Sequence, residues 1–120
     1  MKTQQMKILG APEGAPFLKV LIVDSFLTRF TGLMFHKKLM PATGLLLVPC
    51  NSVHMCFMRF AIDVVYLDKE YKILKVVKNL RPWISLSMCS QAWGTLELTA
   101  GEAENCGLEV GKQLVLAPVF

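Results

Sequence analysis

The segment CNSVHMCFMRFAID, residues 50–63, concentrates the side chains that are best able to do chemistry. On a straight β-strand, side chains alternate between two faces, so Cys50, His54 and Cys56 would share a face. Thiolate and imidazole groups are ligands that suit zinc or copper. However, a proline before Cys50 and the pair Asn-Ser after it predict a turn there, and the two ligand pairs of a typical zinc site are missing from the sequence. We therefore assign no metal ligand and no cofactor, and interpret Cys56 as a core residue.

A cysteine near a histidine also suggests nucleophilic catalysis, in which the imidazole accepts the proton of the thiol. Neighbouring positions on one strand face are roughly 6–7 Å apart, because the rise is about 3.3 Å per residue. That separation prevents direct proton transfer between His54 and Cys56 within one strand, whereas Cys50, across the turn, could come closer. An enzyme that uses Cys50 with His54, as a hydrolase or through a metal, stays open as the alternative function, and no residue is assigned as catalytic.

Three charged side chains, Arg29, Arg59 and Asp63, interrupt apolar stretches of the chain. Each must be paired or reach water, because burying a lone charge is costly. Structural ion pairs or contact with solvent would account for them. The functional interpretation is an anion-binding pocket, since a guanidinium fork fits carboxylate or phosphate and His54 adds a titrating donor. The candidate ligand-binding residues are therefore Arg29, Cys50, His54, Arg59 and Asp63.

Short strands must position these residues, because apolar and β-branched runs recur between turn signals. We expect strands at 17–23, 45–49, 53–58, 62–68, 72–80, 93–99 and 113–120. The strands on either side of the polar turn DKEY should form a hairpin. In the strand 93–99, Leu96 and Leu98 should point inward and Glu97 outward.

Two short helices are expected between the strands. Asp24 or Ser25 can cap a helix within residues 24–35, and residues 100–107 read as a helical turn that Gly107 closes. These elements predict a mainly β (α+β) fold, a compact antiparallel β-barrel or sandwich of six or seven short strands with about two short helices.

The chain is expected to contain one domain. Residues 1–14 are polar and then rich in glycine and proline, which predicts a flexible N-terminal arm, and residues 15–120 would form the domain. Residues 81–91, which open with Arg-Pro, are predicted to be irregular.

Composition narrows the range of partners. The net charge is only +4 and the basic residues are scattered, so we expect no nucleic-acid partner. Apolar runs are far shorter than the about 20 residues of a membrane span, and no secretory signal is recognisable, so we expect no membrane contact and a cytoplasmic location. The four cysteines lack a C-x-x-C pair and should be reduced and mostly buried. The hydrophobic fraction of 53% slightly exceeds what a monomer of this size needs, which would fit either a very apolar interior or the buried contact of a homo-oligomer.

From about residue 18 to 117, the chain resembles the small bacterial and archaeal proteins of domain of unknown function 192 (DUF192). The resemblance rests on the order and spacing of TRFTGLM (28–34), TGLLLVPC (43–50), VH followed by MRFAID (58–63), LELTAG (96–101) and GLEVGKQL (107–114). It implies a β-rich, barrel-like fold and carries no established activity.

The resemblance also marks recurrent polar positions, which fall on Arg29, Cys50, His54, Arg59 and Asp63. The chain departs from the subgroup pattern V-H-T-x-x-M-R-F-P-I-D at residues 55–57 and at Ala61. These departures weaken any metal site that requires Cys56. We therefore hypothesise a non-enzymatic domain that binds a small ligand or a partner. The alternatives are an enzyme or a structural module of a larger assembly.

Overall fold

The computed structural model describes residues 2–11, 14, 17–23, 43–54, 60–82 and 86–118. Within these ranges the fold is mainly β, as the sequence predicts. The described elements are β1 (Lys2–Ile8), β2 (Leu18–Val23), β3 (Thr43–Leu47), β4 (Ser52–His54), β5 (Ile62–Leu67), β6 (Ile73–Leu80), β7 (Leu86–Met88), β8 (Gly94–Thr99), helix α2 (Glu102–Asn105) and β9 (Leu114–Pro118). Two strands beyond those expected, β1 and β7, are present.

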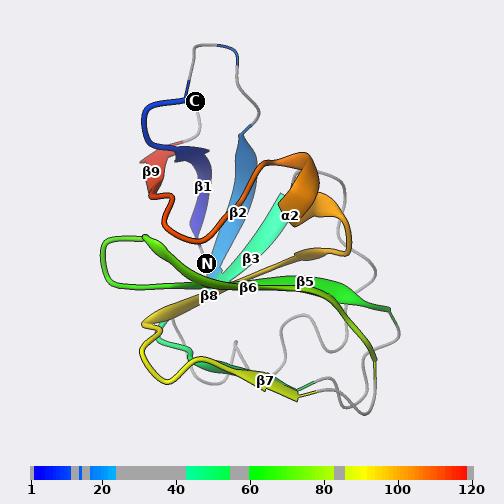
Figure 1. The fold of residues 1–120 in the computed structure, drawn as a ribbon. Coiled ribbons are helices and arrows are strands. Elements are labelled where there is room, and N and C mark those ends of the chain that lie inside the picture. Colours follow the sequence, from blue (N-terminus) through cyan, green and yellow to red (C-terminus); the bar gives the residue numbers. More distant parts are fainter. Residues whose placement is uncertain are drawn as a thin grey trace.

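Seven strands form one curled sheet in the order β6-β5-β8-β3-β2-β1-β9, while β4 and β7 form a separate two-stranded ribbon (Figure 1). Neighbours in the sheet are antiparallel except β2 and β3, which are parallel. The two edges of the sheet meet at one corner, where Lys72 and Gln113 form an isolated bridge. There the Ile73 N–H donates to the Lys112 carbonyl at 2.8 Å. The sheet is therefore a half-barrel that closes at one corner.

Two hydrophobic clusters occupy the two faces of the sheet. One cluster includes Met6, Val20, Leu96 and Leu98. The second cluster joins the other face of the sheet to the ribbon, and its buried members are Leu45, Leu47, Val53, Ile62, Val64 and Tyr66. Because side chains alternate along a strand, β8 contributes Leu96 and Leu98 to the first cluster and turns Thr95, Glu97 and Thr99 toward the second.

The central strands β5 and β8 are buried along their whole length. The prediction that Glu97 points outward into solvent is therefore wrong, since only 6% of this residue is exposed. The prediction that Glu97 points to the opposite face of the strand from Leu96 and Leu98 is confirmed. Alternation separates core from solvent only where one face of a sheet is wet, and here both faces of β8 are covered.

The predicted arm at residues 1–14 is also wrong over Lys2–Ile8. This segment is strand β1, which pairs with β2 on one side and with β9 on the other. Its polar composition hides the strand, because Met6 alone, at 1% exposure, supplies a fully buried apolar side chain. Backbone pairing with two distant segments stabilises β1, and a local pattern does not reveal such pairing.

Several other expectations can be compared with the fold. The hairpin around DKEY is confirmed as β5 and β6, and the helical turn at 100–107 is confirmed as α2, with Gly107 at a φ of 69° just beyond it. The irregular segment 81–91 contains β7, which was missed. The predicted helix at 24–35 lies outside the described residues, as do residues 55–58 of the predicted strand 53–58.

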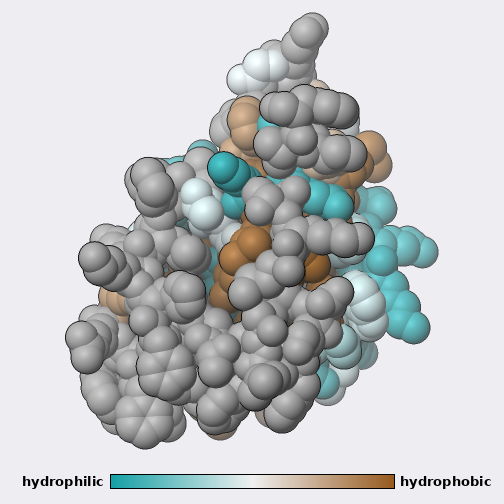
Figure 2. Space-filling view, turned by 180° about the vertical axis from the view of Figure 1, so that it is seen from behind, coloured by the Kyte–Doolittle hydropathy of each residue, from teal (hydrophilic) through white to brown (hydrophobic). Residues whose placement is uncertain are grey.

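Large apolar side chains are exposed at a few places among the described residues: Leu9, Phe17, Leu86, Met88, Val110 and Val115. The view from behind shows described apolar residues reaching the surface between polar ones (Figure 2). Leu86 and Met88 alternate along β7 with the buried Ser87, so the ribbon presents one face to the sheet and the other to solvent.

The carboxylate of Asp63 joins three elements on the face of the sheet that carries Leu96 and Leu98. Its Oδ1 accepts the N–H of Asn79 at 2.8 Å, and its Oδ2 accepts the N–H groups of Gly101 and Ala103 at 2.9 and 3.0 Å. Asn79 has a φ of 57° beside a register shift between β5 and β6. Asp63, which is 1% exposed, therefore satisfies backbone donors of β6 and of the start of α2.

We expect Asp63→Ala to lower the free energy of unfolding by about 3 kcal/mol, because three N–H groups lose a charged acceptor. Asp63→Asn should cost less, since one carbonyl oxygen remains. Urea denaturation measures both. Glu109→Ala is the control, because this carboxylate is 72% exposed and forms only a surface ion pair with Lys112, so its loss should cost less than about 1 kcal/mol. Equal effects of Asp63→Ala and Glu109→Ala would contradict the structural role.

Candidate functional site

The ribbon β4–β7 covers the sheet face that carries Glu97. In the ribbon, Val53 is opposite Ser87, and both are buried. One end of the ribbon is held to β8 by two hydrogen bonds: the Cys50 N–H donates to the Trp93 carbonyl at 2.9 Å, and the Thr95 hydroxyl donates to the Cys50 carbonyl at 2.8 Å. Polar side chains accompany the apolar ones where the ribbon packs on the sheet. We call these polar residues the polar layer and define it by Cys50, Tyr66, Ser87, Cys89, Thr95 and Glu97.

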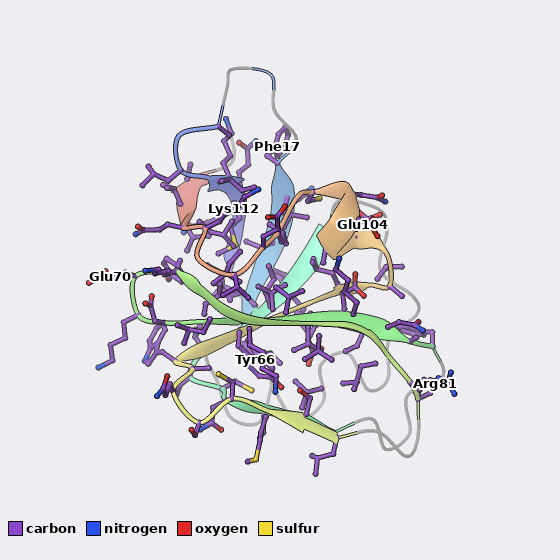
Figure 3. All side chains as sticks on the ribbon, viewed as in Figure 1. Phe17, Tyr66, Glu70, Arg81, Glu104 and Lys112 are labelled. Atoms are coloured by element: carbon purple, nitrogen blue, oxygen red, sulfur yellow. The ribbon has the colours of Figure 1, made fainter. Side chains whose placement is uncertain are left out.

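Tyr66 crosses the polar layer from β5 to the ribbon (Figure 3). Its hydroxyl donates to the Ser87 hydroxyl oxygen at 2.9 Å in a buried hydrogen bond. Burial raises the pKa of Tyr66, the hydrogen bond with Ser87 opposes that rise, and Cys50, Cys89 and Glu97, when ionised, add to it. Tyr66 therefore stays protonated at neutral pH and acts as a hydrogen-bond donor.

Lys75 brings a positive charge to the edge of the same layer. Its register partner is Tyr66, and its ammonium lies 5.9 Å from the centre of the Tyr66 ring. The ammonium also donates to the Met88 carbonyl at 3.0 Å. Lys75 thus connects β6 to the ribbon and places a cation over an aromatic face.

Glu97 lies at the centre of the layer. Its neighbours across the strands are Leu45 on β3 and Val64 on β5, so its carboxyl group is set among apolar residues. Burial raises its pKa from 4.5 to about 7. Within the described ranges no cation forms an ion pair with it. A carboxyl group with this pKa exists in both protonation states near neutral pH, so it can donate or accept a proton.

The structure separates the residues that the sequence singled out. Cys50 lies in the polar layer, half-buried, and its thiol donates to the Ser52 carbonyl at 3.2 Å. Asp63 lies on the opposite face of the sheet and does not meet Cys50. The backbone of His54 pairs with Leu86 in the ribbon, while its side chain is outside the described part of the structure, as are Arg29 and Arg59.

Tyr66, Ser87, Cys89 and Thr95 are not among the site residues predicted from the sequence, and Glu97 was predicted to face solvent. One signal was available for Glu97: threonine, a strand former with an uncharged side chain, stands two residues away on either side, at 95 and 99. A wet strand face more often carries several charges. Nothing local marks Ser87, because its burial depends on the tertiary contact with Tyr66.

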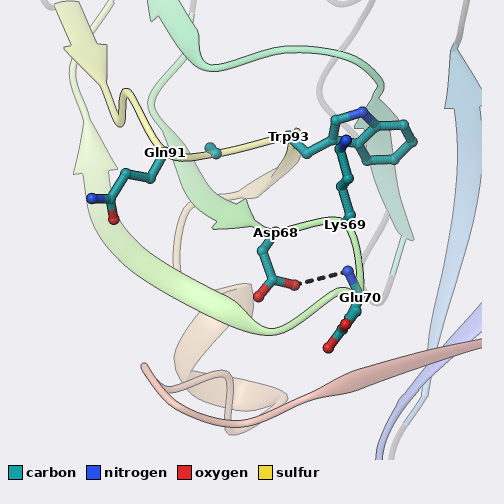
Figure 4. A pocket seen from close by; sticks show the side chains of 6 residues that line it. Asp68, Lys69, Glu70, Gln91 and Trp93 are labelled. Atoms are coloured by element: carbon teal, nitrogen blue, oxygen red, sulfur yellow. Dashed lines mark hydrogen bonds between the residues drawn. The ribbon is translucent and has the colours of Figure 1, made fainter.

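A second concave region lies at the turn between β5 and β6. This depression of about 440 Å³ is lined by Asp68, Lys69, Glu70, Gln91, Ala92 and Trp93 (Figure 4). Asp68 is already used by the turn, because its Oδ1 accepts the N–H groups of Glu70 and Lys72, each at 2.9 Å. The depression is open and the carboxylate of Asp68 already bonds to the turn, so we do not take it as the candidate site.

The described residues contain neither a cluster of metal-ligating side chains nor a membrane-spanning helix. No group of three or more histidine, cysteine or acidic side chains there could hold a metal ion. None of the helices in the same part of the chain is long and apolar enough to cross a membrane.

These features define a small β half-barrel domain with a polar layer under a two-stranded ribbon. The chain belongs to the DUF192 family, an uncharacterized ACR, whose model matches residues 10–116. This confirms the resemblance seen in the sequence motifs.

Curated relatives carry the family description UPF0127 protein. The chain is 35% identical over 103 residues to one from Pyrococcus furiosus, a match that covers 81% of this chain and 85% of the relative. It is 31% identical over 99 residues to one from Pyrococcus horikoshii, covering 80% and 85% of the two chains.

Two crystal structures share the fold. A Sinorhizobium meliloti protein, described as a candidate transcription regulator, has a TM-score of 0.84 at 20% identity and covers 98% of this chain and 95% of its own. A Novosphingobium aromaticivorans protein of unknown function has a TM-score of 0.80 at 16% identity, with coverages of 94% and 84%. At these identities the likeness concerns the fold alone.

The buried Glu97 should make stability depend on pH. Its folded-state pKa is raised above the unfolded value, so its contribution is fully present below about pH 4.5 and is lost as the pH rises through about 7. The loss should be roughly 3 kcal/mol. We expect Glu97→Gln to remove this part of the pH dependence when urea unfolding is measured between pH 5 and pH 8.

Glu70→Gln is the matched control for this measurement, because Glu70 is exposed at the β5–β6 turn. Its pH profile should run parallel to that of the wild type. A Glu97→Gln profile that also ran parallel to the wild type would show that the carboxyl group is not desolvated.

The hydrogen bond between Tyr66 and Ser87 should couple the ribbon to the sheet. In a double-mutant cycle of Tyr66→Phe and Ser87→Ala, we expect a coupling energy of about 1 kcal/mol in the free energy of unfolding. Chemical denaturation of the four proteins gives this value. A cycle of Tyr66→Phe with Glu109→Ala supplies the uncoupled reference, and a coupling near zero in both cycles would exclude a stabilising bond.

Proposed function

We propose that this domain binds a small polar ligand in the polar layer, with the carboxyl group of Glu97 at the centre of the site. The observation that supports this proposal is the position of Glu97, a carboxyl group buried in the middle of the sheet beside Leu45 and Val64. Burial of a carboxylate is costly unless a donor or a cation compensates for the lost water. A ligand with an ammonium, guanidinium or other donor group would provide that compensation.

The other groups of the polar layer support the same proposal. Tyr66 and Ser87 are hydroxyl groups within one hydrogen bond of each other, and Lys75 places a cation at the edge. A site built from a few oriented polar groups on an apolar background is typical of small-molecule binding. Cys50 contributes a half-buried thiol to this surface.

Three of the sequence-derived candidates remain part of the proposal. Arg29, Arg59 and His54 would supply donors for an acidic group of the ligand, so that Glu97 and these residues would together recognise a molecule with charges of both signs. Asp63 is not included, because its carboxylate already accepts three backbone N–H groups.

We also propose a cytoplasmic location for this activity. The described cysteines, Cys50, Cys89 and Cys106, are free thiols. Thiols in this state are usual in a reducing compartment.

Thermal unfolding with a panel of small probes tests the proposal. The panel contains amines such as agmatine and butylamine, free amino acids, and dicarboxylates, each at millimolar concentration. We expect amines or amino acids to raise the Tm of the wild type by roughly 5 °C or more near saturation. Glu97→Gln should weaken binding of the same probe at least about tenfold, because the ionic partner is lost.

Glu70→Gln, at an exposed turn on the sheet, should retain the wild-type response to each probe. Two outcomes would overturn the proposal. One is a wild-type Tm that no probe class changes, and the other is a Tm increase of equal size in the wild type and in Glu97→Gln.

A further inference from the structure

Two cysteines lie close together at the end of the ribbon. The N–H of Cys89 donates to the carbonyl of Asn51 at 2.9 Å, which extends the pairing of β4 and β7 by one position. Cys50 therefore stands one residue away from the position opposite Cys89. A one-residue offset between paired strands separates the Cα atoms by about 6 Å. Cys50 itself lies outside β4 and its main chain bonds to Trp93 and Thr95, so the alternation that would turn its side chain away from that of Cys89 does not apply to it. Disulfides bridge Cα atoms about 4.4–6.8 Å apart.

The side chains of both cysteines belong to one environment. Both pack against the cluster that joins the sheet to the ribbon, and both are free and half-buried. Either thiol, when ionised, would raise the pKa of the Tyr66 hydroxyl. Both side chains therefore belong to the layer between the ribbon and the sheet.

The third described cysteine differs from this pair. Cys106 is buried at 9% exposure in the cluster on the opposite face of the sheet. Burial, together with the negative charge of Glu102, raises the pKa of its thiol. A thiol that resists ionisation reacts slowly with oxidants, so Cys106 provides an internal reference.

We propose that Cys50 and Cys89 form a reversible redox pair that closes to an intramolecular disulfide when the protein meets a peroxide. One thiolate attacks the peroxide, the O–O bond breaks, and a sulfenic acid forms with release of water from hydrogen peroxide. The second thiol then displaces the sulfenic oxygen as a second water, and the S–S bond forms. Two thiols lose two electrons and two protons, and one hydrogen peroxide is reduced to two waters.

The disulfide would join the residues that flank β4 and β7 at one end of the ribbon. Cys50 and Thr95 already connect this end of the ribbon to β8, so the bond would fix the ribbon over the polar layer. The inference does not depend on the proposed ligand, because the disulfide is measured directly as a covalent product.

The chain allows a clean test by mass spectrometry. Trypsin places Cys50 in the peptide 39–59 and Cys89 in the peptide 79–112, but each peptide holds a second cysteine, Cys56 or Cys106. We would use the variant Cys56→Ser/Cys106→Ala, treat the folded protein with about one equivalent of hydrogen peroxide, and digest it without reduction. We expect peptides 39–59 and 79–112 to be joined in most molecules, and dithiothreitol to separate them.

Two further measurements keep the test decisive. In the wild type, fragment-ion sequencing of the joined peptides should locate the bond at Cys50 and Cys89, which covers the case of a variant that does not fold. Cys50→Ser should leave Cys89 without a resolving thiol, so that dimedone, which traps sulfenic acid, labels Cys89 at least about tenfold more than in the intact pair.

The proposal fails under either of two results. In the first, Cys50 and Cys89 are oxidised separately, no faster than Cys106, and remain unjoined. In the second, the joined peptides appear only after urea unfolding or only in covalent dimers.

Discussion

The hydrogen bond between Tyr66 and Ser87 marks the contact on which the rest of the domain depends, the seating of the ribbon on the sheet. Without the ribbon, the face of β5 and β8 that bears Tyr66 would be open to water. With it, both faces of the central strands are covered, and a second hydrophobic cluster forms. That contact buries Glu97. It also sets the environment of Cys50 and Cys89, which pack against the same cluster. The main-chain bonds of Cys50 to Trp93 and to Thr95 hold the same end in place.

Two buried carboxylates on neighbouring strands show how environment assigns different roles to similar side chains. Asp63 and Glu97 are both less than a tenth exposed. Asp63 accepts three backbone N–H groups, which compensate its charge and make it part of the framework. Glu97 faces the aliphatic side chains of its cross-strand partners, and its charged form is disfavoured. Hydrogen bonds thus make Asp63 part of the framework, whereas burial raises the pKa of Glu97 to about 7.

What could be predicted from the sequence was local. The hairpin of β5 and β6 was foreseen because its turn carries polar residues between two alternating strands, and Asp68 does bond within that turn. The position of Cys50 at a turn was likewise recognisable. Strand β1 was not foreseen, because its stability comes from partners that lie more than ten residues away on one side and more than a hundred on the other. Glu97 was misplaced for a related reason, since a one-dimensional pattern cannot show that a distant ribbon covers its face.

The pairing of β1 with β9 has a consequence for the order in which the molecule can be made. Gln4 is opposite Pro118 in this register, so β1 receives its second neighbour only when β9, more than a hundred residues later in the chain, has been made. Until then β1 presents an unpaired edge, which is open to pairing with other chains. Contacts of such long sequence separation also slow folding, because a long loop must close before they form. The sheet is thus completed only once β9 has been made and has paired with β1.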